Sequence, residues 1–157
     1  MLPFKKVLCP TDFSAPSCEA VSAASEVARM FSAPLVLVHV VQPLPAAATA
    51  ASGYPIDIEA LETALLEHAK QRLHEFAHTH VGRDVTTILR AVRGSVAAEI
   101  LEVAIGEDVD LIVISTHGET GLRHVLLGSV AERVVRMATC PVLTVRCDHL
   151  LTSEKRT

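Results

Sequence analysis

The sequence has very few aromatic residues: no tryptophan, one tyrosine and four phenylalanines among 157 residues. Half of the residues are nevertheless apolar, so the core has to be built from Val, Leu, Ile and Ala side chains. Such a core is typical of helices packed on a buried β-sheet. The length suits one domain, which we expect to span residues 1–148, followed by a flexible polar tail over residues 149–157.

Long runs of one kind of residue are also missing. The formal net charge is −4 and no long run of lysine or arginine occurs, which argues against nucleic acid or an anionic membrane surface as the main partner. No apolar run reaches the roughly 18 residues that a membrane span needs. The apolar stretch near the amino terminus is too short for a signal peptide. The sequence therefore predicts a cytoplasmic protein without a membrane partner.

The cysteines, Cys9, Cys18, Cys140 and Cys147, match no CxxC zinc or redox signature. In a reducing compartment we expect them to be free thiols.

Strand and helix patterns alternate along the whole chain. Strands are predicted at residues 5–9, 34–41, 84–92, 110–115 and 141–146, and helices at residues 15–31, 58–80, 95–105 and 129–138. Because several strands are almost continuously apolar, they should be buried on both faces, as in a parallel sheet with helices on both sides. Ligands of such folds bind at the carboxyl ends of the strands, where the strand order reverses. That edge should contain residues 10–12 and 115–118.

Two further segments carry specific expectations. Residues 42–57, rich in proline and alanine, are predicted to form a surface loop. The core face of the helix at residues 58–80 is predicted to consist of Ile58, Leu61, Leu65, Ala69, Leu73 and Phe76.

A glycine-bearing segment follows the fourth predicted strand. Gly118 and Gly121 precede Gly128 and Ser129, which open the next helix. Glycines allow close approach of a ligand to the backbone, and a helix amino terminus offers unpaired N–H groups with a partial positive charge. One interpretation is a phosphate-binding loop, and the other is an ordinary helix start preceded by turns. The segment is neither a GxxxxGK[ST] loop nor a GxGxxG fingerprint.

The whole chain resembles the universal stress protein family. The resemblance is carried by KKVLCPTDFS at the amino terminus, the strand ending Val38-His39-Val40, the segment STHGETGL, the Gly118-x9-Gly128-Ser129 spacing and the closing ATCPVLTVR. It implies an adenine nucleotide α-hydrolase-like α/β fold, a doubly wound parallel sheet of five strands in the order 3-2-1-4-5.

The ATP-binding branch of that family carries the motif G-x2-G-x9-G-[ST]. Here Ser115 stands where the motif has its first glycine, and the rest is intact. The resemblance implies binding of ATP or another adenine nucleotide, with Mg²⁺ as a possible companion. The nucleotide contacts that it implies are Pro10, Thr11, Asp12, Val40, Ile114, Ser115, Gly118, Gly128, Ser129 and Val130. The contact at Ser115 stays open.

Several polar residues have two interpretations each. Asp12 either contacts a ribose or Mg²⁺, or caps the first helix. His117 either touches a phosphate or braces the loop. His74 and His78 are spaced like metal ligands, but a solvated helix face is the preferred interpretation. His39, inside an apolar strand, is expected to be a hydrogen-bonded core residue.

Two classes of function follow. The first is a nucleotide-binding regulatory module of the stress response, and the second is an interaction protein of the same fold that acts through dimerisation alone. No catalytic constellation stands out, so any ATP hydrolysis should be slow. The predicted last strand, Pro141 to Arg146, would lie at a sheet edge, which needs cover. Family members resemble one another in pairing this strand across a two-fold axis, so we expect a homodimer with Val142 and Thr144 at its interface.

Overall fold

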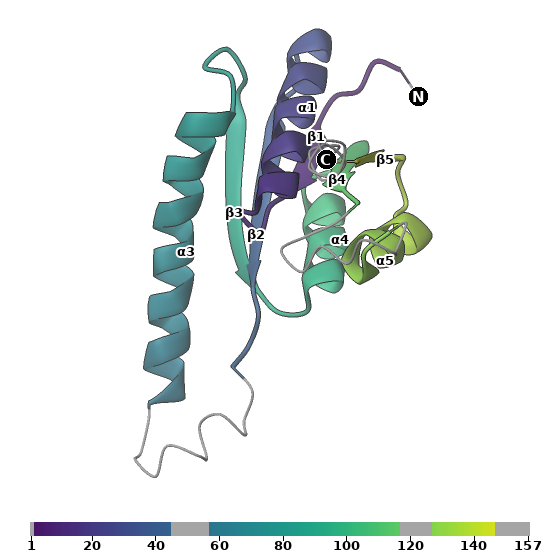
Figure 1. Cartoon of the computed structure of the whole chain (residues 1–157). Helices are drawn as coiled ribbons and strands as arrows, with labels where there is room; N and C mark the ends of the chain where they lie inside the picture. Colours follow the sequence, from purple (N-terminus) through teal and green to yellow (C-terminus); the bar gives the residue numbers. More distant parts are fainter. Residues whose placement is uncertain (1, 45–56, 117–126, 147–157) are drawn as a thin grey trace, which may run out of the picture.

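The computed structural model describes residues 2–44, 57–116 and 127–146, in which strands and helices alternate (Figure 1). The elements are β1 (Val7–Pro10), α1 (Ala15–Phe31), β2 (Leu35–Val41), α3 (Ile58–His80), β3 (Thr87–Arg93), α4 (Val96–Gly106), β4 (Leu111–Ser115), α5 (Ser129–Met137) and β5 (Val142–Val145). The expected tail and most of the expected loop at residues 42–57 lie outside the described residues.

The strands form one parallel five-stranded sheet in the order β3-β2-β1-β4-β5, which confirms the predicted topology. The central strand β1 is buried on both faces, and Leu35 to Val38 of β2 are fully buried as well. Continuous burial of successive residues explains the uninterrupted apolar runs of these strands.

Two helices cover each face of the sheet (Figure 1). Leu35 and Leu37 of β2 pack with α1 and α3 on one face, while Val36 and Val38 pack with α4 and α5 on the other. This alternation follows from the two-residue period of a strand. Small alanines of α1, such as Ala20 and Ala24, are fully buried and let the helix lie close to the sheet.

The ends of α1 and α3 coincide with the predicted bounds, and the strands differ by a few residues. The largest difference is at β3, which begins at Thr87 and not at residue 84. Val85 N–H donates to the Gly82 carbonyl in a turn, and the Asp84 carboxylate pairs with Arg29 of α1. These two contacts hold residues 82–85 out of the ladder.

Three of the cysteines, Cys9, Cys18 and Cys140, are free thiols, as predicted, and Cys147 lies outside the described residues. Burial raises the pKa of the Cys9 thiol, so this side chain packs as a small apolar group. None of the helices in residues 2–44, 57–116 and 127–146 combines the length and the apolar character that crossing a membrane requires.

The predicted core face of α3 is wrong in its amino-terminal half. Ala69, Leu73 and Phe76 are buried, but Ile58, Leu61 and Leu65 are 37–40% exposed. A helix of 23 residues is about 34 Å long, whereas a seven-residue strand spans about 23 Å. The amino-terminal half of α3 therefore extends beyond the strands that its other half covers (Figure 1).

This difference predicts unequal costs of two leucine truncations in α3. Leu73→Ala, at a site 1% exposed, should lower the free energy of unfolding by about 3 kcal/mol because it leaves a cavity. Leu61→Ala, at a site 40% exposed, should change it by less than about 0.5 kcal/mol. Urea unfolding followed by circular dichroism measures both values. Similar losses for the two variants would contradict the exposure of the amino-terminal half.

Candidate functional site

A cavity of about 580 Å³ opens at the carboxyl edge of the sheet. The ends of β1, β2 and β4 form its floor, and the first turns of α4 and α5 and one side chain of α3 form its walls. β1 has β2, the next strand of the chain, on one side and β4 on the other. The strand order therefore reverses at this point. Open α/β sheets bind their ligands at such a position.

All the sequence-predicted site residues that the structure describes line this one cavity. They are Pro10, Thr11, Asp12, Val40, Ile114, Ser115, Gly128, Ser129 and Val130. Gly118, together with Gly121, His117 and His124, lies outside the described residues. The structure thus brings the predicted residues together at one cavity, while the role of each residue in binding stays a prediction.

The turn between β1 and α1 is held by several hydrogen bonds. The Thr11 N–H donates to the Val38 carbonyl at 2.9 Å, which extends the pairing of β1 with β2 by one residue. The Thr11 hydroxyl accepts the Phe13 N–H at 3.0 Å and lies 3.0 Å from the buried Ser17 hydroxyl. Thr11 is only 5% exposed. Its hydrogen bonds fix the part of the cavity wall that comes directly before Asp12 in the chain.

Asp12 does not cap α1, so that interpretation of it is wrong. The N-cap is Ser14, whose side chain accepts the Ser17 N–H. The Asp12 carboxylate accepts hydrogen bonds from both the N–H and the hydroxyl of Ser14 and so braces the residue that caps the helix. Asp12 is exposed and lines the cavity, which leaves its outer side accessible to a ligand.

The amino terminus of α5 forms the opposite wall. Its N-cap is Gly128, with no side-chain cap, and Ser129 is the first helical residue. The first N–H groups of a helix have no intrahelical partners and carry the positive end of its dipole. The Gly128 N–H donates to the Thr116 carbonyl at 2.7 Å, and the Thr116 N–H donates to the Val145 carbonyl of β5 at 2.8 Å. Thr116 therefore fixes the position of α5 against the sheet.

Phe13, His39 and Arg72 are among the lining residues of the cavity that were not predicted as contacts. The Nδ1 of His39 lies 2.8 Å from the Thr11 carbonyl, and the His39 and Phe13 rings lie 4.4 Å apart between centroids. The Arg72 guanidinium carbon lies 4.2 Å from the centroid of the Phe13 ring, a cation–π contact. His39 is hydrogen-bonded, as predicted, but it also faces the cavity.

The environment of His39 favours its neutral form. Burial lowers the pKa of the imidazole, and the Arg72 charge adds to this effect. The Thr11 carbonyl and the Asp12 carboxylate act in the opposite direction but do not prevail. Because a carbonyl oxygen can only accept, the Nδ1 of His39 carries the proton toward Thr11.

The sequence offered one signal for His39. It lies near the end of β2 beside Val40, which was among the predicted nucleotide contacts. Arg72 gave no such signal, because nothing in the sequence distinguishes it from the other exposed charges of α3.

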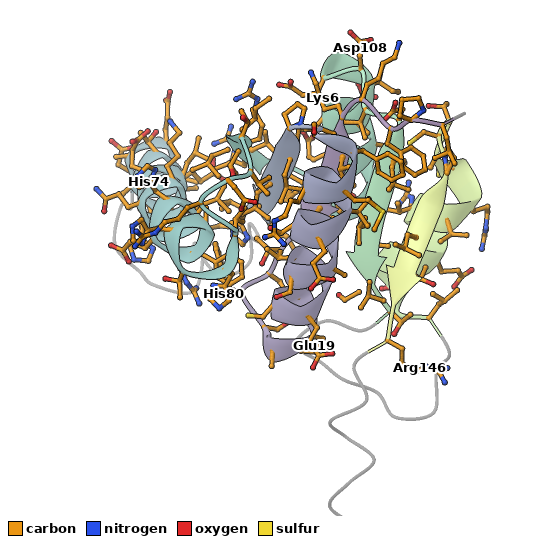
Figure 2. The ribbon with its side chains drawn as sticks, turned by 90° about the horizontal axis from the view of Figure 1, so that it is seen from above. Lys6, Glu19, His74, His80, Asp108 and Arg146 are labelled. Atoms are coloured by element: carbon orange, nitrogen blue, oxygen red, sulfur yellow. The ribbon has the colours of Figure 1, made fainter. Side chains whose placement is uncertain are left out.

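His74 and His78 are exposed on α3, which confirms the solvated-face interpretation. Figure 2 shows His74 on the side of α3 farther from α1. Within residues 2–44, 57–116 and 127–146, His, Cys, Asp and Glu side chains form no group of three that could hold a metal ion.

Comparison with protein families gives a match to the universal stress protein family over residues 3–146. One relative is universal stress protein MJ0531 of Methanocaldococcus jannaschii. It is 37% identical over 143 residues, which cover 91% of this chain and 82% of that protein.

Solved structures give the same result. A structure of the protein MJ0577 aligns with a TM-score of 0.75 and 30% identity, covering 91% of this chain and 96% of that one. A universal stress protein in complex with cAMP aligns with a TM-score of 0.61 and 25% identity, covering 91% and 97% of the two chains.

The pKa of His39 predicts a pH dependence of stability. Because folding lowers this pKa from about 6.5, the unfolded chain binds more protons than the folded one between the two values. The free energy of unfolding should therefore fall as the pH is lowered through 6.5 toward the folded-state pKa, and His39→Asn should reduce the slope. Urea unfolding from pH 7.5 to pH ~5 measures both slopes. Equal slopes for the two proteins would show that His39 does not titrate in this way.

Proposed function

The chain belongs to the universal stress protein family, and on that premise we propose that it binds an adenine nucleotide, ATP first among the candidates, in the cavity at the carboxyl edge of the sheet. In this proposal Pro10, Thr11, Asp12 and Val40 frame the adenosine, and Ile114 and Ser115 lie beneath it. Gly118, Gly128, Ser129 and Val130 receive the phosphates.

The amino terminus of α5 is the observation that carries the proposal. It opens on the cavity, and its N-cap, Gly128, contributes no side chain between the helix and a ligand. Phosphate oxygens are the groups that such a terminus binds best, since its N–H groups donate to them and its dipole attracts their charge. A complex of a structural relative with cAMP supports an adenine nucleotide as the ligand class.

The opposite wall suits the sugar. The cavity is lined by one carboxylate, that of Asp12, among the residues that the structure describes. A carboxylate beside a nucleotide is favourable when it accepts hydrogen bonds from ribose hydroxyls or when it binds Mg²⁺ that also contacts the phosphates. With no cluster of acidic residues around Asp12 in the described parts of the chain, Mg²⁺ would depend on the phosphates for most of its ligands.

Ser115 distinguishes this chain from the ATP-binding motif. It is the last residue of β4 and lines the floor of the cavity. Serine is small, so we propose that the nucleotide lies close to the backbone at Ser115. Its stronger contacts are with Gly128 and Ser129.

The biological role that we propose is that of a small cytoplasmic regulatory module of the stress response, whose nucleotide state changes its surface. No catalytic constellation stands out in the sequence, so we propose binding with at most slow hydrolysis.

The second candidate function is that of a dimeric interaction protein of the same fold. β5 pairs with β4 on one side only and lies at the edge of the sheet, where Leu143 is 42% exposed. An apolar edge strand of this kind favours association with another copy. We propose a homodimer through residues 141–146, which is compatible with nucleotide binding because β5 does not line the cavity.

A thermal-shift comparison tests nucleotide binding. At a ligand concentration 100 times the Kd, ATP with Mg²⁺ should stabilise the protein by about 2.7 kcal/mol, a rise in Tm of roughly 5–10 °C. Gly128→Val should abolish this shift, because it places a branched side chain at the start of α5, where the phosphates are proposed to lie.

Gly106→Val is the matched control. Gly106 ends α4 away from the cavity, and a Cβ added there has open space around it, so the ATP-dependent shift should be retained. A wild-type protein whose Tm does not respond to ATP, AMP or cAMP would refute the nucleotide proposal.

Sedimentation velocity tests the dimer. The wild type should sediment as a dimer at micromolar concentration, and Leu143→Lys should shift it to the monomer because a charge is placed in the apolar contact. Met30→Lys, at a site of α1 that is 77% exposed, should leave the dimer intact. A monomeric wild type would contradict the proposal.

A further inference from the structure

His39 of β2 forms a side-chain hydrogen bond to the turn after β1. The bond runs from Nδ1–H to the Thr11 carbonyl at 2.8 Å. On its other side, the Thr11 N–H donates to the Val38 carbonyl, also of β2. The peptide groups on both sides of the Thr11 Cα are thus attached to the same strand, one by the backbone and one by an imidazole.

The turn needs such an attachment, because its own backbone is strained. Phe13, directly after Asp12, has a φ of 65°, in the left-handed region that an aromatic residue rarely adopts. The other non-glycine residues with positive φ in the described part of the chain, Ser32 and Asp108, follow helix ends, where this conformation is common. Phe13 lies at the cavity, so the strain is located at the proposed binding site.

Contacts with neighbouring rings keep Phe13 in this conformation. Its ring lies 4.4 Å from that of His39 and 5.3 Å from that of Phe76, between centroids, and Arg72 contacts it at 4.2 Å. His39 therefore holds the turn twice, through the Thr11 carbonyl and through the Phe13 ring. Between these two residues lies Asp12, the carboxylate proposed to face the sugar or Mg²⁺.

We propose that His39 is a positioning residue of the nucleotide site: its Nδ1–H holds the Thr11 carbonyl, and this hydrogen bond orients Asp12 toward the ligand. The inference rests on the proposed nucleotide binding and adds to it a residue that was not among the predicted nucleotide contacts. His39 needs no contact with the ligand for this role.

Three substitutions separate the hydrogen bond from the ring. His39→Leu removes the donor. His39→Asn keeps an amide donor the same number of bonds from Cα as Nδ1, and His39→Gln places it one bond farther away. His39→Leu and His39→Gln should weaken ATP binding about fivefold to tenfold, as expected for one lost hydrogen bond, and His39→Asn should stay within about twofold of the wild type. Isothermal titration calorimetry, on proteins shown by circular dichroism to be folded, measures the Kd values.

Double variants test whether His39 acts through Asp12. In the Asp12→Asn background, His39→Leu should cost less than about twofold, because the group that it orients has lost its charge. In the Ser129→Ala background, on the opposite wall, the full loss should persist. If His39→Leu fails to fold, His39→Gln takes its place in both backgrounds.

The possible failures are distinct. A wild type that binds no nucleotide refutes the proposed function and this inference with it. Normal binding by His39→Leu, or equal losses for His39→Leu and His39→Asn, overturns the role of the hydrogen bond while nucleotide binding stands. Equal losses in the Asp12→Asn and Ser129→Ala backgrounds overturn the route through Asp12.

Discussion

The pairing of β1 on both sides is the constraint on which the rest of the structure depends. β1 is buried between β2 and β4, and Thr11 continues its pairing with β2 past the end of the strand. In a parallel sheet the chain leaves neighbouring strands at the same edge. The carboxyl ends of β1 and β4 therefore lie beside each other, and the cavity opens there. Its position is a consequence of the topology before any side chain is considered.

The parts of the fold that depend on local pattern were predicted well. The bounds of α1 and α3 followed from apolar periodicity and from the residues at their ends, and the strand order followed from the family resemblance. The exposed half of α3 was not predicted, because periodicity identifies an apolar face but not the length of the sheet beneath it. A comparison of the predicted helix length with the predicted strand lengths supplies that information, and apolar periodicity does not include it.

The residues of the candidate site that belong to sequence motifs were predicted. The residues that only tertiary packing brings to the cavity were not. Gly128 and Ser129 belong to a spaced pattern that can be read from the sequence. Arg72 reaches the cavity only because α3 packs beside the turn after β1, and its contact is with the ring of Phe13. The tautomer of His39 likewise depends on a carbonyl of the turn after β1. No spacing along the chain contains these relations.

The two candidate functions use separate surfaces but share one residue. Gly128 lines the cavity and Leu143 lies on the exposed edge strand, so each can be altered without the other. Thr116 connects them, since its carbonyl accepts the Gly128 N–H and its N–H donates to Val145 of β5. A change in the pairing of β5 would therefore act on the start of α5 through a single residue, Thr116. A β5 variant that binds nucleotide more weakly is consequently consistent with a cavity that β5 does not line. Only variants in the cavity itself decide between the two functions.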